Sequence, residues 1–165
     1  MVHRANMEWT LASNSSAPES AGNNDASQHL QVQRVLTDAA ADLLVATAVS
    51  SAQELNLAVS IAVVDRAGQL LRFTRMSNAI LVSVGMAQDK AYTAVSFGLP
   101  THQWTDIIKD DPQLLRGIPP YPRLVILGGG CPINLNGELV GGIGVSGGHY
   151  LQDMEIAQKA LAALR

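Results

Sequence analysis

The stretch from Leu127 to Gly148, LGGGCPINLNGELVGGIGVSGG, holds nine of the chain's fourteen glycines and a single charged residue, Glu138. Glycine at this density either shapes tight β-structure or allows a backbone to approach a neighbour closely. The pair Asn-Gly at positions 136 and 137 separates two apolar runs and is the strongest short signal for a β-hairpin. The stretch therefore predicts two antiparallel strands, over residues 131–135 and 138–147.

A second hairpin and one further strand are predicted upstream. Residues 57–65, LAVSIAVVD, form a β-branched run, RAG makes a turn, and residues 69–75, QLLRFTR, form the return strand. Residues 123–127, RLVIL, predict another short strand. Five strands joined largely by hairpins predict an antiparallel sheet.

Four segments have helical periodicity. The first covers residues 38–55, with Thr37 as its N-cap. The second covers residues 78–97, where Gly98 and Pro100 then stop the helix. A short helix begins at position 101, and an amphipathic helix covers residues 149–164.

The remaining segments complete the predicted architecture. Residues 112–122, PQLLRGIPPYP, are predicted to be a proline-pinned loop, and Ile80 and Leu151 are assigned to inward helix faces. Residues 1–35 are predicted to be a flexible N-terminal tail. The predicted order is α-β-β-α-α-β-β-β-α, which is a single α+β domain over residues 36–165 with helices packed against the sheet.

The amino-acid composition indicates which kinds of molecule the protein can bind. Hydrophobic residues make up 47% of the chain and charged residues only 15%, which favours a homo-oligomer that covers exposed apolar surface. A net charge of −3 without any run of Lys or Arg argues against nucleic acid and anionic membranes. No apolar run approaches the roughly 20 residues of a membrane span, and no signal-peptide core precedes the domain. The single cysteine, Cys131, fits a reducing compartment, so we expect a cytoplasmic protein.

Common catalytic signatures do not occur in the sequence. It contains no GxSxG, HExxH, CxxC or GxxxxGK motif. GGIGVSGG has spacings like those of a dinucleotide-binding turn, but it belongs to the predicted second hairpin and not to a βαβ unit. The function therefore has to be sought in individual side chains.

Four separated stretches resemble one known family. They are VSIAVVDRAGQLLRFTRM, AQDKAYTAVSFGLPT, LVILGGGCPI, and GELVGGIGVSGG followed by QDMEIAQKAL. In this order they resemble the small haem-binding proteins of the GlcG/HbpS type, a module also found at the C-terminus of some cobalamin adenosyltransferases. The likeness covers residues 36–164. It implies a profilin-like α+β fold, assembly into higher oligomers with ligand sites near subunit contacts, and haem binding, which in some members accompanies haem degradation or redox sensing.

Lys90 and Thr93 are candidate site residues in the family-like stretch DKAYTA. They lie three residues apart and so share one face of the predicted second helix. Lys90 either extends to solvent or holds a carboxylate, such as a haem propionate, as a point charge. The resemblance favours a ligand or site-shaping role.

Glycines and one proline form a second candidate group. Gly129, Gly130 and Pro132 belong to a turn that either presents backbone N–H groups to an anion or makes a tight bend between strands. Gly147 and Gly148 come directly before the last helix, whose N-terminus is a place where anions bind.

His149 and Asp153 open the last helix. His149 stands where the family pattern has a small capping residue, and it is a general base, a metal or haem ligand, or a helix cap. Asp153 either anchors a loop or pairs with a basic residue, or it acts in acid–base catalysis together with Lys90 and His149.

Thr101 and His102 begin the short helix near the expected pocket rim. His102 replaces the short polar residue of the family pattern, and it is either a structural residue or a haem axial ligand.

Three functions remain open at this point. The preferred one is an oligomeric protein that binds haem or another tetrapyrrole, with Lys90, the glycine turns and either His102 or His149 holding the ligand. The second is an isomerase, lyase or hydrolase that acts on a carboxylated metabolite. The third is an accessory protein without catalytic activity that stabilises an enzyme.

Overall fold

The computed structural model describes residues 26–165. The chain divides into two units, residues 1–33 and residues 34–165. The described part of the first unit contains one short helical turn, η1 (Ala26–His29). The second unit contains every other helix and strand. The prediction of a tail over residues 1–35 lies largely outside the described residues. Among those described, no helix is long and apolar enough to cross a membrane.

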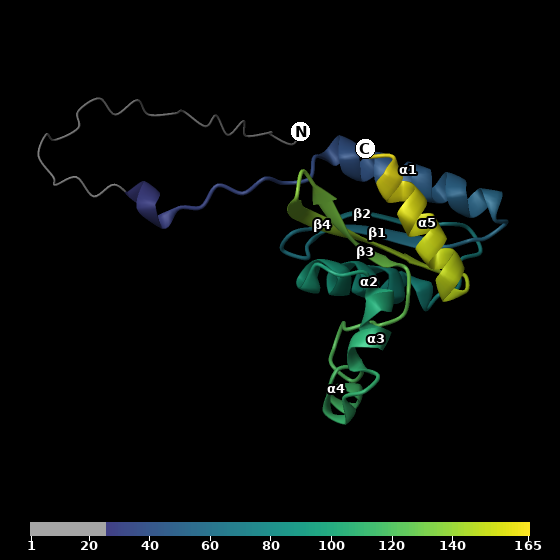
Figure 1. The fold of residues 1–165 in the computed structure, drawn as a ribbon. Helices are drawn as coiled ribbons and strands as arrows, with labels where there is room; N and C mark the ends of the chain where they lie inside the picture. Colours follow the sequence, from purple (N-terminus) through teal and green to yellow (C-terminus); the bar gives the residue numbers. More distant parts are fainter. Residues whose placement is uncertain (1–25) are drawn as a thin grey trace, which may run out of the picture. The chain divides into compact units, whose positions relative to one another are not determined.

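The centre of the second unit is an antiparallel sheet in the order β2-β1-β4-β3 (Figure 1). Its strands are β1 (Ser60–Asp65), β2 (Leu70–Arg75), β3 (Gly130–Leu135) and β4 (Glu138–Ser146). Asn136 and Gly137 both have positive φ and turn the chain from β3 into β4, as the Asn-Gly signal predicts. The two central strands, β1 and β4, are buried along most of their length.

Helices cover both faces of this sheet (Figure 1). One face packs against α1 (Asp38–Glu54) and α5 (Tyr150–Ala162), and the other packs against α2 (Ser83–Phe97). The Thr37 hydroxyl caps α1 by accepting a hydrogen bond from the Ala40 N–H at 3.2 Å, as predicted. The chain is therefore an α+β domain with an antiparallel sheet between helical layers.

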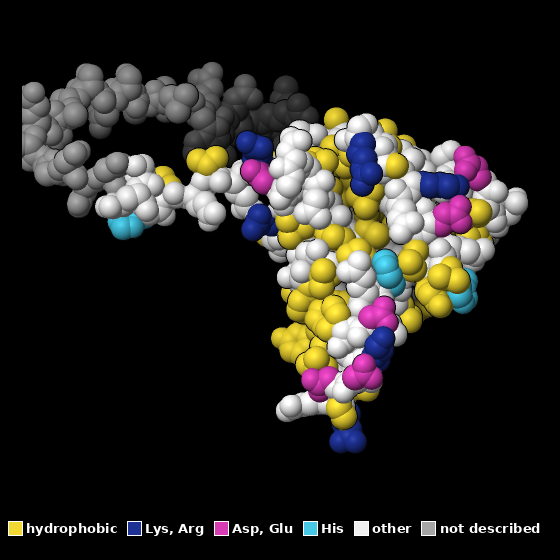
Figure 2. All heavy atoms as spheres, in the orientation of Figure 1, with side chains coloured by type: hydrophobic (Ala, Val, Ile, Leu, Met, Phe, Trp, Pro, Cys, Tyr) yellow, Lys and Arg dark blue, Asp and Glu magenta, His cyan; other side chains and the backbone are white. Residues whose placement is uncertain are grey.

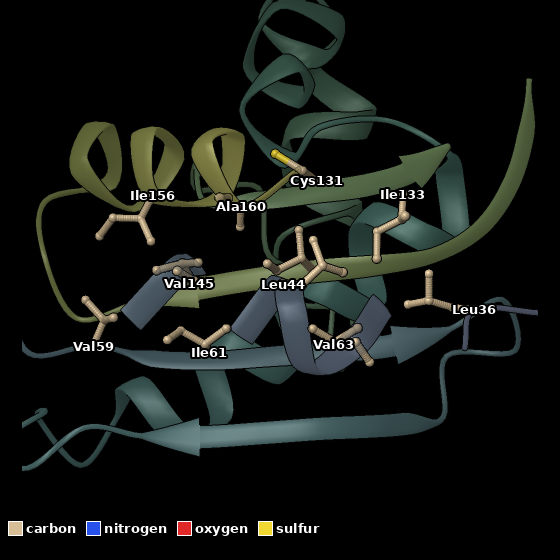
Figure 3. Packing of buried hydrophobic residues seen from close by; sticks show 14 of the residues in the cluster. Leu36, Leu44, Val59, Ile61, Val63, Cys131, Ile133, Val145, Ile156 and Ala160 are labelled. Atoms are coloured by element: carbon tan, nitrogen blue, oxygen red, sulfur yellow. The ribbon is translucent and has the colours of Figure 1, made fainter. Parts of the chain in front are cut away.

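Two apolar clusters fill the spaces between these layers. The larger one lies under α1 and α5 and includes Leu44, Ile61, Val145 and Ile156 (Figure 3). The smaller one lies under α2 and consists mostly of alanine and valine. Alternate residues of β1 enter opposite clusters, because successive side chains of a strand point to opposite faces of the sheet.

The glycines of β4 explain how closely α2 approaches the sheet. A Cβ atom on Gly142 would lie 2.5 Å from the backbone oxygen of Ala91, and one on Gly144 would overlap the backbone oxygen of Ala87. The α2 backbone therefore rests directly on the β4 backbone. This close approach is the reason for the glycine density of this strand.

The sheet has four strands, so the prediction of five is wrong. Residues 123–127 form no strand. Instead, the backbone groups of Arg123 and Val125 hydrogen-bond to the side chain of Thr93, and that of Leu127 bonds to Thr101. Side-chain hydroxyls thus take the place of a neighbouring strand. The observed order is α1-β1-β2-α2-α3-α4-β3-β4-α5.

The segments around α2 also differ from the prediction. The helix begins at Ser83 and not at Asn78, whose φ of +70° places it in a turn, and Ile80 in this turn is 56% exposed. On α5, Leu151 is likewise exposed, because the inward face of that helix begins with Asp153 and Ile156.

An arm made of two short helices follows α2. Its helices are α3 (Trp104–Ile108), which continues from the turn η2 (Thr101–Gln103), and α4 (Pro112–Gly117). The segment that contains α4 was predicted to be a loop. It is helical because Asp111 accepts hydrogen bonds from the next two free N–H groups and because proline fits the first turn of a helix. In Figure 1 the arm extends away from the sheet.

We expect Gly144→Ala to destabilise the domain by about 2–4 kcal/mol, because its methyl group would collide with the α2 backbone. Gly85→Ala is the matched control, since nothing lies within 4 Å of the added atom. That control should be neutral or should stabilise α2 by about 0.5–1 kcal/mol. Urea unfolding of both variants checks the prediction, and equal stabilities would contradict the close packing.

Candidate functional site

A buried ion pair joins α2 to α5 at the end of β4. The Nζ atom of Lys90 lies 2.8 Å from Oδ2 of Asp153 and donates a second hydrogen bond of 2.9 Å to the Val145 carbonyl oxygen. Each of the two charged side chains is only 2% exposed. The sequence placed both residues in family-like motifs. The structure brings them together across sixty-three positions of the chain.

Burial shifts the pKa of both partners. Desolvation lowers the pKa of Lys90 from its ordinary value, although the charge of Asp153 acts in the opposite direction. Desolvation likewise raises the pKa of Asp153, against the opposing effects of Lys90 and of the hydrogen bond from the Gly148 N–H at 3.0 Å. Both shifts have the same cause, because neither group lies at the surface. The pair connects the start of α5 to the middle of α2.

The glycine turn, for which the sequence left an anion site and a tight bend open, packs against this pair. Gly129 has a φ of +114°, and a Cβ atom there would lie 3.0 Å from the Lys90 Nζ and 2.8 Å from the Asp153 Cβ. A Cβ atom on Gly130 would meet the Lys90 backbone. Glycine is required here because no side chain fits between the turn and the ion pair.

Two threonine hydroxyls hold the segment that leads into this turn. Thr93 donates to the Arg123 carbonyl and accepts from the Val125 N–H, both at 2.9 Å. Thr101 donates to the Leu127 carbonyl at 2.6 Å and accepts from the Gly130 N–H at 3.0 Å. Both hydroxyls are therefore committed to positioning this backbone.

The threonine-held segment forms one wall of a pocket of about 380 Å³. The other walls come from the start of the arm and from the first residue of α5. Its lining residues are His102, Thr105, Ile126, Leu127, Gly128 and Tyr150. None of them is charged. The pocket is therefore an apolar hollow that contains one imidazole and two hydroxyl groups.

His102 is the side chain in this pocket with potential metal chemistry. Its Nδ1 atom is buried and has no hydrogen-bond partner in the described part of the chain. Buried polar atoms are almost always paired, so an unpaired imidazole nitrogen needs an explanation. The ring forms no hydrogen bond within the described residues, and only its Nε2 atom is accessible from outside, because Nδ1 is buried.

His149 has a structural role as the N-cap of α5. Its Nδ1 accepts a hydrogen bond from the Leu151 N–H at 3.4 Å, and its own N–H donates to Gln152 at 2.9 Å. This arrangement is a capping box. Its ring lies next to that of Tyr150, with 4.4 Å between the centroids, but His149 itself does not line the pocket.

The other predicted site residues do not line this pocket. Gly147 and Gly148 form the turn that precedes α5, where Gly148 bonds to Asp153. Pro132 lies on β3 and lines a separate hollow of about 130 Å³ next to the end of α5. Among the described residues, no cluster of three or more His, Cys, Asp or Glu could hold a bare metal ion.

Sequence reasoning missed most of the pocket lining. Thr105 lies three residues after His102 on the same helical face, and this spacing was the available signal. Ile126 and Leu127 were hidden by their assignment to a strand. Tyr150 gave no signal beyond being next to His149.

Cys131 is buried in the larger apolar cluster. Burial raises the pKa of its thiol to about 11. The thiolate is the reactive form of cysteine, so this residue is not a nucleophile at neutral pH.

We expect Lys90→Met to cost about 3–5 kcal/mol, because it leaves the Asp153 carboxylate buried without a cation. The double variant Lys90→Met/Asp153→Asn should be more stable than Lys90→Met alone, since asparagine can still accept the hydrogen bond from Gly148. Urea unfolding of both single variants and the double variant gives the coupling energy, which we expect to exceed about 1 kcal/mol. Additive effects would show that the pair is not an energetic unit.

Comparison with known proteins finds a family model and several similar chains. A family model described as "Haem degrading protein HbpS-like" matches residues 36–162. A 15.0 kDa protein encoded between dhaT and dhaS in Citrobacter freundii is 38% identical over 76% of this chain and 89% of its own length.

Two further relatives have more specific descriptions. The corrinoid adenosyltransferase PduO of Salmonella typhimurium is 39% identical over 73% of this chain, but the match spans only 36% of PduO. The solved structure of a PduOC:heme complex superposes with a TM-score of 0.70 at 36% identity, and covers 79% of this chain and 95% of that one.

Proposed function

The chain belongs to the HbpS-like family of haem-degrading proteins, and from this premise we propose that it binds haem in the pocket beside His102. A single observation carries the proposal. The His102 imidazole, which forms no hydrogen bond within the described residues and whose Nε2 is accessible, lines a hollow without charged side chains. Haem needs an apolar slot and an axial ligand, and this pocket contains both. The similarity to a haem complex supports the same assignment.

The pocket residues would divide the contacts to haem among them. His102 would provide the axial ligand, and Ile126, Leu127 and Tyr150 would pack against the macrocycle. Bound haem would supply redox chemistry at its iron, whereas the protein residues bind and orient it. His149 is the second candidate for the axial position, because its cap uses only Nδ1.

We also propose that the protein is a homo-oligomer in which a second copy covers the arm. The helix α4 has no buried residue, and Ile107, Leu115 and Tyr121 on or near the arm are 45–66% exposed. Figure 2 shows apolar side chains along one edge of the arm, beside charged side chains. Such apolar side chains are normally covered by another surface. The arm also carries Lys109 and Arg116, and a neighbouring copy could bring such cations to the propionates, because no cation lines the pocket.

The other two functions stay predictions. An enzyme that uses Lys90, Asp153 and His149 for acid–base chemistry would need the ion pair to open, because Lys90 and Asp153 are closed off from solvent and bound to each other. An accessory role without catalysis would need the apolar arm and no particular pocket residue. Haem degradation goes beyond binding, and it would need a reductant and oxygen in addition to the pocket.

Haemin titration of the full-length protein tests the haem proposal. We expect a saturable Soret shift in the wild type and a loss of affinity of roughly tenfold or more in His102→Ala, because one metal–ligand bond is removed. Added imidazole should restore the spectrum of His102→Ala by entering the vacated space. His149→Ala should bind haemin as the wild type does.

His29→Ala is the control for adventitious binding of haemin to an exposed histidine, since His29 lies in the other unit of the chain. The melting temperature of each variant shows whether its fold is intact. An unchanged titration in His102→Ala would show that another residue is the axial ligand. The absence of any saturable shift in the wild type would end the haem proposal.

A further inference from the structure

A second pocket, of about 310 Å³, lies between the β1–β2 turn and the first half of α2. It shares no lining residue with the pocket beside His102. Its polar side chains are Gln69 from the turn, Gln88 and Asp89 from α2, and Arg123 from the segment that the threonines hold. In contrast to the first pocket, this one contains a charged pair and two amides.

Three contacts with residues of α2 hold Arg123 in place. Its carbonyl accepts the hydrogen bond from Thr93, and its guanidinium carbon lies 3.8 Å from the centroid of the Tyr92 ring. Its Nε donates to Oδ1 of Asp89 at 3.2 Å. The φ of Arg123 is +67°, an uncommon value for a residue other than glycine, which the Thr93 contact holds in place. The guanidinium is therefore preorganised on α2.

These contacts leave one edge of the guanidinium free. The pairing with Asp89 uses Nε, and the two terminal nitrogens of Arg123 form no hydrogen bond within the described residues. A planar guanidinium with two parallel free N–H groups matches a carboxylate in a bidentate arrangement. Because the side chain is already ordered, little conformational entropy would be lost when an anion binds.

Two glutamines that line the same pocket add further hydrogen-bonding groups. The Nε2 atom of Gln88 donates to the Val84 carbonyl at 3.1 Å, which leaves its own carbonyl oxygen free to accept a hydrogen bond. The Gln69 side chain forms no hydrogen bond within the described residues, whereas its backbone N–H is bonded to Asp65. These amides suit a hydroxyl or oxo group next to a carboxylate.

We propose that this second pocket binds a small 2-hydroxy or 2-oxo carboxylic acid, with the carboxylate on the free edge of Arg123 and the neighbouring oxygen on Gln69 and Gln88. The negative charge of Asp89 lies beside the same guanidinium and reduces its attraction for an anion. The affinity for the carboxylate therefore depends more on the alignment of its hydrogen bonds with Arg123 than on the net charge of the pocket. We expect a dissociation constant of roughly 1 mM. The site is independent of the haem proposal.

Lactate is the test ligand, and propionate and lactamide are its matched analogues. Propionate lacks the hydroxyl group and lactamide lacks the charge. The full-length protein, labelled with ¹⁵N-arginine, is titrated at constant ionic strength while the Arg123 Nε–H signal is followed by NMR. We expect saturable shifts with lactate, weaker binding of propionate, and no binding of lactamide at the same concentrations.

Three variants and one control report on the mechanism. Arg123→Gln, followed by saturation-transfer NMR on lactate, should lose roughly tenfold or more in affinity because the bidentate contact is gone. Asp89→Asn should bind lactate roughly threefold or more tightly, because it removes a like charge while its side-chain oxygen can still accept from Nε. Gln69→Ala should weaken binding severalfold without changing the melting temperature. Arg165→Gln removes the same charge from an exposed residue that does not line this pocket, and it should bind lactate as the wild type does.

The increase in affinity expected for Asp89→Asn cannot arise from misfolding, so the proposal remains testable even if Arg123→Gln unfolds. The proposal is overturned by the absence of saturable lactate binding, by equal binding of lactamide, or by unchanged affinity in a folded Arg123→Gln. Haemin titration of the same variants keeps the two sites apart, because Arg123→Gln should bind haemin normally. Failure of haemin to bind the wild type would leave the lactate result unaffected.

Discussion

The buried ion pair between Lys90 and Asp153 is the interaction on which the rest of this structure depends. It connects α2 and α5, which lie on opposite faces of the sheet, at the point where β4 ends. A charge pair with 2% exposure is tolerated only when further hydrogen bonds support it, and here the Val145 carbonyl accepts from Lys90 and the Gly148 N–H donates to Asp153. The lack of space around the pair in turn requires glycine at position 129.

The segment between the arm and the glycine turn shows how side chains can replace a strand. Its composition is that of a β-strand, but Thr93 and Thr101 bind its backbone through hydroxyl groups. A segment paired in the sheet would present alternate residues to the two helical layers. Held by hydroxyls, it instead contributes Arg123 to one pocket and Leu127 to the other. This segment, which lies outside the sheet, thus lines both hollows.

Local signals in the sequence predicted local structure well. The Thr37 cap, the Asn136–Gly137 turn and the helix stop at Gly98 each depend on one or two residues, and each is present. The prediction of a strand over residues 123–127 was wrong because two threonines from elsewhere in the chain bind this backbone. The sequence of the segment itself contains no sign of these contacts. The partner of Lys90 was equally hidden, since an ion pair across sixty-three positions has no periodicity to detect.

The distribution of family-like residues suggests a division between framework and ligand contacts. Lys90, Thr93 and Asp153 belong to stretches that resemble the family, and all three are used to hold helices and loops together. In the pocket, His102 replaces the short polar residue of the family pattern, whereas Ile126, Leu127 and Gly128 belong to the family-like stretch LVILGGGCPI. Ligand preference can therefore change at the pocket without disturbing the framework, because a new side chain there breaks no buried contact of the ion pair. On this argument the family membership determines the fold, and the pocket side chains of each member determine what it binds.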